Sequence, residues 1–222
     1  MRILLAATRM LLSQSAPLIL GSASPRRRDI LSSLRIPFRV VPAAVDESAE
    51  AGEDPARYLV RIVPDKLAGS ARAVIASSIG ASGIVVADTI VVVDGEILGK
   101  PRDRSHAEEL LIRLLGRTHD VMTRYAISVA PRLAEPRLSR TVESRVTMRS
   151  AGPDEVERYA ATGEGLDKAG AYAAQGIGAF LISRIEGSFT NVVGLPACEL
   201  VEDLLATGLL ESFPISGTGL AE

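Results

Sequence analysis

The stretch IVVADTIVVVDG at residues 84–95 decides the fold class of this chain. Its first ten residues are mostly β-branched, with few polar breaks, which predicts a central strand buried on both faces of a sheet. Asp94-Gly95 is a strong hairpin signal, which predicts an antiparallel strand directly after it. Strands alternate with helices on both sides of this stretch, and the whole pattern predicts an α/β fold with a mixed sheet.

The residues before this stretch predict a strand, a helix, a second strand and a long helix. Residues 18–21 are a short apolar run, and Ser24 followed by Pro25 has the composition of a helix start. Residues 38–41 follow a proline and predict the second strand. The long helix is expected over residues 54–79.

Two helices carry notable residues. Pro64 lies inside the long helix and is expected to kink or interrupt it. Ser105 is expected to cap a later helix, with Glu108 at the capping-box position. The other elements expected, in chain order, are strands 118–130 and 137–148, a helix from 153 to before 163, a glycine-rich loop 163–178, a strand 180–185 and a helix 194–205.

Composition narrows the class of protein. The chain has 222 residues, of which 47% are hydrophobic and 23% charged, so a folded domain is expected. Its formal net charge is −2, whereas proteins that hold polymeric nucleic acid usually carry a basic excess. Any bound phosphate should therefore belong to a small molecule. The single cysteine, Cys198, excludes an internal disulfide and is expected to be a small apolar residue packed on a helix.

No membrane-spanning segment is expected from the sequence. No apolar run reaches the roughly 18–20 residues that span a bilayer. The segment MRILLAATRMLL at residues 1–12 resembles a weak signal peptide, but Arg9 interrupts it, so we expect a short extension, with Met10 as an alternative start. Residues 217–222 are expected to be a frayed tail. We expect a cytoplasmic protein, which the cysteine content allows.

Residues 22–27, SASPRR, combine a strand end, a turn of small residues and a helix start. Helix N-termini present free N–H groups and a partial positive charge. Arg26 and Arg27 add bidentate donors for phosphate. The pattern predicts a phosphate site. The alternative is a solvated basic helix start, in which the positive charge would oppose the helix dipole.

Two acidic residues follow predicted strands or lie within them. Asp88 stands amid valine and isoleucine, where a carboxylate is costly to bury unless a cation or hydrogen bonds satisfy it. A role as a metal ligand or as a general base would explain its position. The alternative is a structural aspartate whose oxygens are satisfied by hydrogen bonds. Glu47 belongs to VDES at residues 45–48, which alone is a polar turn.

Two loops carry lysines, LGKP at residues 98–101 and LDKAG at residues 166–170. Glycine lets the backbone approach a ligand closely, and Lys100 and Lys168 could neutralise phosphate charge. The amide of Gln175 could pair with the edge of a base. Two ordinary turns with exposed lysines are the alternative.

Several common motifs are missing. The chain has no G-x-x-x-x-G-K-[ST] phosphate loop, no strand-linked G-x-G-x-x-G and no H-E-x-x-H. His106 and His119 are far apart in sequence, and we expect both to be surface or strand residues. The chemistry must therefore rest on the segments described above.

Taken together, these segments resemble the Maf family of nucleotide pyrophosphatases. The matching stretches are SASPRRRDIL at 22–31, VDES at 45–48, ADTIVVVDGEILGKPRD at 87–103, LDKAGAYAAQG at 166–176 and NVVGLP at 191–196. The resemblance implies an elongated α/β fold with two lobes around a cleft, related in shape to inosine triphosphatase. The catalytic domain would span residues 18–207, between an N-terminal extension (1–17) and a C-terminal tail (208–222).

The resemblance also implies a chemistry, the hydrolysis of the α–β phosphate link of nucleoside triphosphates with a divalent ion, Mg²⁺ or Mn²⁺. Asp88, Glu47 and Lys100 would be catalytic, and Asp88 and Glu47 would hold the metal. The substrate-binding residues would be Ser22, Arg26, Arg27, Lys66, Thr89, Lys168 and Gln175, the last of which would help to read the base. The partner would be a small-molecule nucleotide, with no membrane and no polymeric nucleic acid, and a homodimer is a family-level expectation.

The segments SPRR, GKP and DKAGAYxxQG favour the branch of the family that acts on dTTP and UTP. The alternatives are a pyrophosphatase for 7-methyl-GTP or modified nucleotides, and a nucleotide-binding regulator of septum formation with little catalysis. The chain departs from the family pattern at Val86, where glycine is usual, at Pro64, and at Ala173, where the late loop has lost a glycine.

Overall fold

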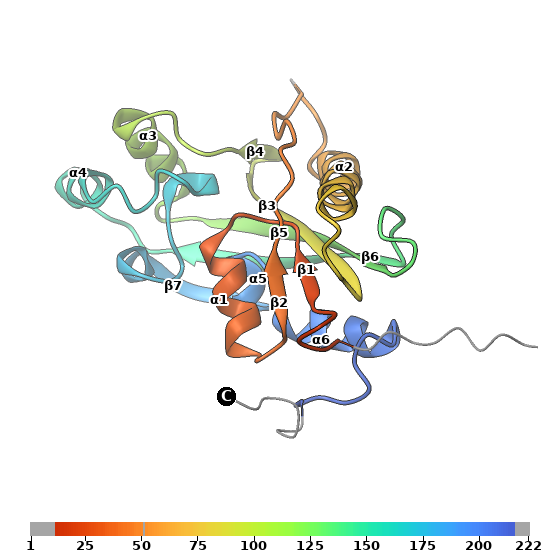
Figure 1. Cartoon of the computed structure of the whole chain (residues 1–222). Coiled ribbons are helices and arrows are strands. Elements are labelled where there is room, and N and C mark those ends of the chain that lie inside the picture. Colours follow the sequence, from red (N-terminus) through yellow and green to blue (C-terminus); the bar gives the residue numbers. More distant parts are fainter. Residues whose placement is uncertain (1–11, 51, 216–222) are drawn as a thin grey trace, which may run out of the picture.

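The computed structural model describes residues 12–50 and 52–215, which form a mixed sheet flanked by helices (Figure 1). The strands are β1 (Leu18–Leu20), β2 (Phe38–Val40), β3 (Gly83–Val93), β4 (Glu96–Leu98), β5 (Thr118–Val129), β6 (Leu138–Met148) and β7 (Ile182–Glu186). Their order is β2-β1-β3-β5-β6-β7, with β4 paired to β3. Only the pairs of β1 with β2 and with β3 are parallel, so the α/β class with a mixed sheet is confirmed.

Helices cover both faces of this sheet. They are α1 (Pro25–Ser33), α2 (Pro55–Ala76), α3 (Arg104–Leu114), α4 (Pro153–Ala161), α5 (Phe189–Val193) and α6 (Ala197–Ala206), with the 3₁₀ helices η1 (Ala169–Ala171) and η2 (Ile177–Leu181). In Figure 1, α2 lies above the sheet and α6 below it. α3 and α4 pack in an apolar cluster with Val91 and Val93, which lie near the C-terminal end of β3.

β3 is the central strand, as its sequence predicts. Ten of its eleven residues are buried, and Thr89 is the half-buried exception. Val86 and Ile90 pack in the cluster under α2, whereas Val85 and Ala87 pack in the cluster that contains α1, α5 and α6. The predicted hairpin follows, because Asp94 and the next glycine both have positive φ and return the chain as the antiparallel β4.

Packing accommodates two departures from the family pattern. α2 is one continuous helix, so Pro64 does not interrupt it, and Lys66 lies on its buried face. Val86 packs over Gly21 at the end of β1, where an added Cβ would stand only 2.6 Å from Val86 Cγ1. Ser70 Oγ would stand 2.8 Å from the same Cβ, so Val86 and Ser70 together leave room only for glycine at position 21.

The predicted cap of α3 is wrong by two residues. The N-cap is Asp103, whose carboxylate accepts a hydrogen bond of 2.8 Å from the backbone N–H of His106. Ser105 instead lies within the first turn. Aspartate and serine are both strong N-cap residues, and the aspartate comes first in the chain.

Three features near the C-terminus also differ from expectation. The strand expected over 180–185 begins at Ile182, because η2 occupies the residues before it. A short helix, α5, precedes α6, and Gly194 with φ of 125° separates them. Cys198 lies on α6 but is exposed, so its predicted packing is wrong.

The packed core extends past residue 207. Leu209 and Leu210 are buried, and the N–H of Leu12 donates to the carbonyl of Leu209 at 3.1 Å. The signal-like segment up to residue 11, Met10 and the tail from 216 lie outside the described residues. Among the described helices, none has the length and hydropathy to cross a membrane. The elongated shape and the two lobes stay predictions.

Candidate functional site

A pocket of about 640 Å³ lies where β1 and β3 meet α2 and several loops. All ten residues assigned to a site from the sequence line it: Ser22, Arg26, Arg27, Glu47, Lys66, Asp88, Thr89, Lys100, Lys168 and Gln175. They come from five separate stretches of the chain, which the fold brings to one place. Their chemical roles stay predictions.

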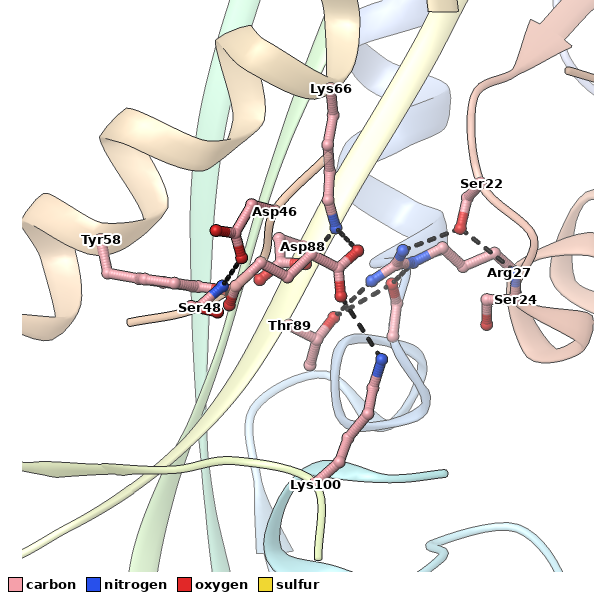
Figure 2. Close-up of polar contacts among 12 residues, drawn as sticks. Ser22, Ser24, Arg27, Asp46, Ser48, Tyr58, Lys66, Asp88, Thr89 and Lys100 are labelled. Atoms are coloured by element: carbon pink, nitrogen blue, oxygen red, sulfur yellow. Dashed lines mark hydrogen bonds and ion pairs between the residues drawn. The ribbon is translucent and has the colours of Figure 1, made fainter. Parts of the chain in front are cut away.

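Lys66 is the centre of a buried charge cluster (Figure 2). Its ammonium reaches from α2 to β3, where it forms ion pairs with Asp88 Oδ1 and, at 2.8 Å, with Glu47 Oε1. The side chains of Lys66 and Asp88 are 7% and 10% exposed. A buried charge is stable only when it is paired, so each of these residues explains the burial of the other.

Glu47 is held through its backbone by a tyrosine and through its side chain by two lysines. The hydroxyl of Tyr58 on α2 donates to the backbone carbonyl of Glu47 at 3.0 Å, and Lys100 Nζ lies 3.4 Å from Glu47 Oε2. Partial burial opposes ionisation, but the hydrogen bonds and charges of Lys66 and Lys100 outweigh it, so the pKa of Glu47 lies below its ordinary value. The sequence reading missed Tyr58, although it stands eight residues before Lys66, on the same helix face.

Arg27 is buried and faces three different segments. Its guanidinium donates to the carbonyl of Gly194 at 2.8 Å, to Ser22 Oγ at 2.9 Å and to Thr89 Oγ1 at 3.1 Å. Ser22 Oγ also accepts from the backbone N–H of Ser24 at 3.3 Å. Because both lone pairs of Ser22 are used, its hydroxyl proton is left to donate to a ligand.

Thr123 supports this arrangement from the neighbouring strand, and no local signal in the sequence indicated it. It is fully buried, stands opposite Thr89 and donates to the carbonyl of Asn191 at 3.1 Å. Because its proton is used there, the proton of Thr89 is shared between Thr123 Oγ1 at 2.9 Å and the carbonyl of Gly194 at 3.3 Å. The oxygen of Thr89 is thereby left to accept from Arg27.

The late loop brings Lys168 and Gln175 to the pocket. Lys168 donates to the carbonyl of Glu164 and to the carboxylate of Asp167, both at 2.5 Å. Asp167 also lies 3.4 Å from Arg26 Nη1, so it joins two of the predicted phosphate-binding cations. Gln175 is exposed at the same pocket. Asp167 was not singled out from the sequence, although it lies within the LDKAG segment.

The pocket is positive on a chain that is negative overall. Five basic side chains and three carboxylates line it, an excess of two positive charges, against −2 for the whole chain. The chain has only three lysines among its 25 basic residues, and all three line this pocket. A lysine is a compact point charge, whereas an arginine is a planar fork. These three positions therefore favour an ammonium in a chain that otherwise uses arginine.

Asp88 and Glu47 are the two carboxylates that would hold a divalent ion, and this role stays a prediction. Both contact the ammonium of Lys66, and Glu47 also pairs with Lys100, so the four side chains together carry no net charge. Mg²⁺ is typically held by one or two carboxylates and takes its other ligands from water and phosphates. The part of the chain that the structure describes has no cluster of three or more His, Cys, Asp or Glu side chains placed for a metal.

Fold and site together define an α/β protein with a cationic pocket that also holds two lysine-paired carboxylates, a combination suited to a phosphorylated small molecule. A family model described as Maf-like protein matches residues 17–207, and the chain belongs to this family.

Relatives in this family match most of the chain. The dTTP/UTP pyrophosphatase of Myxococcus xanthus (strain DK1622) is 46% identical over 192 residues, which are 86% of this chain and 93% of the relative. That of Geotalea uraniireducens (strain Rf4) is 43% identical over 87% of this chain and 96% of its own length. That of Moorella thermoacetica (strain ATCC 39073 / JCM 9320) is 46% identical over 85% and 93%.

Proposed function

We propose that this chain hydrolyses dTTP and UTP to the nucleoside monophosphate and pyrophosphate, as a house-cleaning enzyme of nucleotide metabolism. The observation that carries the proposal is the pocket, which gathers four further cations around the buried pair of Asp88 and Lys66. The dTTP/UTP pyrophosphatases that are 42–46% identical over most of the chain support the same reaction.

Charge explains how the pocket would hold the substrate. Arg26, Arg27, Lys100 and Lys168 would bind the phosphate oxygens, because a triphosphate is strongly anionic and these cations line one cavity. The free proton of Ser22 would donate to one of the same oxygens. Cations that contact the β- and γ-phosphates would also stabilise the charge that develops on the departing pyrophosphate.

In the proposed reaction Asp88 would take up the proton. Water would attack the α-phosphorus, the bond from that phosphorus to the bridging oxygen would break, and the proton of the water would pass to the Asp88 carboxylate. Lys66 and Glu47 would hold that carboxylate in place. A divalent ion held by Asp88 and Glu47 would supply further positive charge to the phosphate oxygens.

The proposal is tested by pyrophosphate release from a panel of nucleoside triphosphates with Mg²⁺, Mn²⁺ or EDTA. We expect release from dTTP and UTP that stops with EDTA. Release from only 7-methyl-GTP or a modified pyrimidine nucleotide would identify that nucleotide, in place of dTTP and UTP, as the substrate. Tight binding of UTP by folded protein, without any release, would favour a regulator and overturn the proposed reaction.

Replacing Thr123 with valine tests the hydroxyl chain behind Arg27. Valine has the same shape but cannot join Thr89 to Asn191, so Arg27 loses part of its support. We expect kcat/KM for dTTP to fall about 5–10-fold, since a buried hydrogen bond contributes about 1 kcal/mol. Thr123→Ser keeps the hydroxyl and serves as the matched control. Equal kcat/KM in the valine and serine variants would contradict the role.

Location and assembly belong to the same proposal. We place the enzyme in the cytoplasm, where nucleoside triphosphates are used, and as a homodimer in keeping with the family resemblance. Cell fractionation and light scattering of the purified chain test these two statements separately from the reaction.

A further inference from the structure

The carboxylate of Glu164 ties together the loop that carries Gln175. Glu164 Oε1 accepts from the N–H of Ile177 at 2.7 Å. Glu164 Oε2 accepts from the N–H of Gly178 at 2.8 Å and from the hydroxyl of Tyr159 on α4 at 2.9 Å. Three donors thus converge on one side chain, which lies at the start of the loop and binds its end.

Tyr159, which contacts Glu164, holds the residues on the other side of Gln175. The hydroxyl of Tyr159 accepts from the N–H of Ala173 at 3.0 Å, so the chain is anchored two residues before Gln175 and two residues after it. The backbone between these anchors passes close to Glu164. Gly176 has φ of 120°, and a Cβ there would stand 2.2 Å from Glu164 Oε1. The loop therefore has one tight path around this carboxylate.

Glu164 is suited to this task because it is charged. Partial burial opposes its ionisation, but the hydrogen bonds from Gly178, Ile177 and Tyr159 outweigh the burial, so the pKa of Glu164 lies below its ordinary value. An ionised carboxylate only accepts hydrogen bonds and therefore matches three donors. A glutamine of the same size would turn an NH₂ group toward at least one of them.

We propose that Glu164 is a positioning residue that holds Gln175 against the base end of the pocket and thereby sets affinity for the nucleoside. This inference rests on the proposed function, because it assumes that the ligand is a pyrimidine nucleoside triphosphate. Glu164 does not line the pocket, whereas Ala173, Ala174 and Gln175 do. It acts through the backbone of the loop, and its replacement keeps both hydrogen bonds of Lys168, to the main-chain carbonyl of residue 164 and to Asp167.

The test compares Glu164→Gln with Glu157→Gln. Glu157 lies on α4, is 67% exposed and is paired only with Arg104 among the ion pairs of the described residues. We expect Glu164→Gln to raise the Kd of α,β-imido-dTTP and the KM for dTTP about 10-fold, because hydrogen bonds to a charged acceptor are strong. We expect kcat to stay within about 3-fold and Glu157→Gln to match wild type.

A double-mutant cycle separates positioning from a general structural effect. In a Gln175→Ala background, Glu164→Gln should change the Kd by less than about 2-fold, because the side chain that it positions is gone. A full 10-fold effect in that background would overturn the inference. So would an unchanged Kd in folded Glu164→Gln protein.

A second variant covers the case in which Glu164→Gln does not fold. Tyr159→Phe keeps the carboxylate and removes the hydroxyl that joins it to Ala173, so a smaller rise of the Kd is expected, about 3-fold. An unchanged Kd would overturn the inference. The proposed function fails by a different result, in which wild-type protein binds the analogue but releases no pyrophosphate from dTTP or UTP.

Discussion

Replacing Asp88 with asparagine is expected to lower kcat for pyrophosphate release by about 10³-fold and to leave the fold intact. Asparagine has nearly the same size, and its amide oxygen can still accept from Lys66. Lys66 also keeps its ion pair with Glu47, so the buried ammonium is not stranded. The lost property is the negative charge, which the reaction needs to take up a proton and to attract a cation.

Asp203→Asn is the matched control for this prediction. Asp203 is as buried as Asp88, at 7% exposure, but it binds Tyr125 and Arg140 on the β5–β6 side and does not line the pocket. We expect this variant to lose stability and to keep its turnover per folded molecule. Circular dichroism and kcat should therefore separate the two aspartates. Near wild-type turnover in Asp88→Asn would remove Asp88 from the mechanism.

Lys66→Met should affect both stability and activity. The ammonium is the common partner of Asp88 and Glu47, and its removal leaves the buried Asp88 without its ion-pair partner and Glu47 with only the exposed Lys100. Breaking a buried pair by deleting one partner costs about 3–5 kcal/mol, toward the lower end here because Glu47 is 44% exposed. We expect kcat to fall about 100-fold, because the carboxylate that takes up the proton is no longer held in place.

The matched comparison is Lys100→Met. Lys100 is 61% exposed and 3.4 Å from Glu47, so its loss should cost at most about 1 kcal/mol of stability. Chemical denaturation of both variants measures the difference. Mn²⁺ should raise the Tm of Lys66→Met more than that of wild type, since a cation can take the place of the ammonium between the carboxylates. Equal stability of the two variants would contradict the central position of Lys66.

The stability of the fold at acidic pH shows whether ionised Glu47 stabilises the protein through its ion pair with Lys66. The pKa of Glu47 is lowered in the folded protein, so its contribution is fully present above the ordinary value of 4.5 and is lost as the pH falls through the lowered pKa. The gap in stability between wild type and Lys66→Met should therefore narrow below pH 4.5. Urea denaturation at a series of pH values measures this gap.

The sequence alone was informative where local chemistry is unusual. The β-branched run of β3 has no other stable place than the middle of a sheet, and a carboxylate within it required a partner. The small-residue turn before Arg26 and the two lysine loops were recognisable because glycine, proline and clustered charge have few alternative uses. Local motifs of this kind indicated most of the ten site residues, whereas Lys66 and the role of Glu47 came from the family resemblance.

Signals with close competitors were less reliable. Asp103 and Ser105 are equally good helix caps, so only the folded chain shows which one begins α3. α5 has five residues, too few to show a helical period, and it was therefore missed. Cys198 was expected to be packed, but its exposure depends on which face of α6 meets the core, and only the folded chain shows that face.

The sequence by itself determined the α/β class, the order of the elements and the residue types gathered for chemistry, because these depend on periodicity and local propensity. Only the tertiary structure decided which partners meet. Lys66 joins Asp88 to Glu47, Thr123 supports Thr89 from the next strand, and Glu164 binds the far end of its own loop. Each of these contacts joins residues that are 13 to 34 positions apart, and Thr123 and Glu164 are ordinary residues until the fold brings their partners to them.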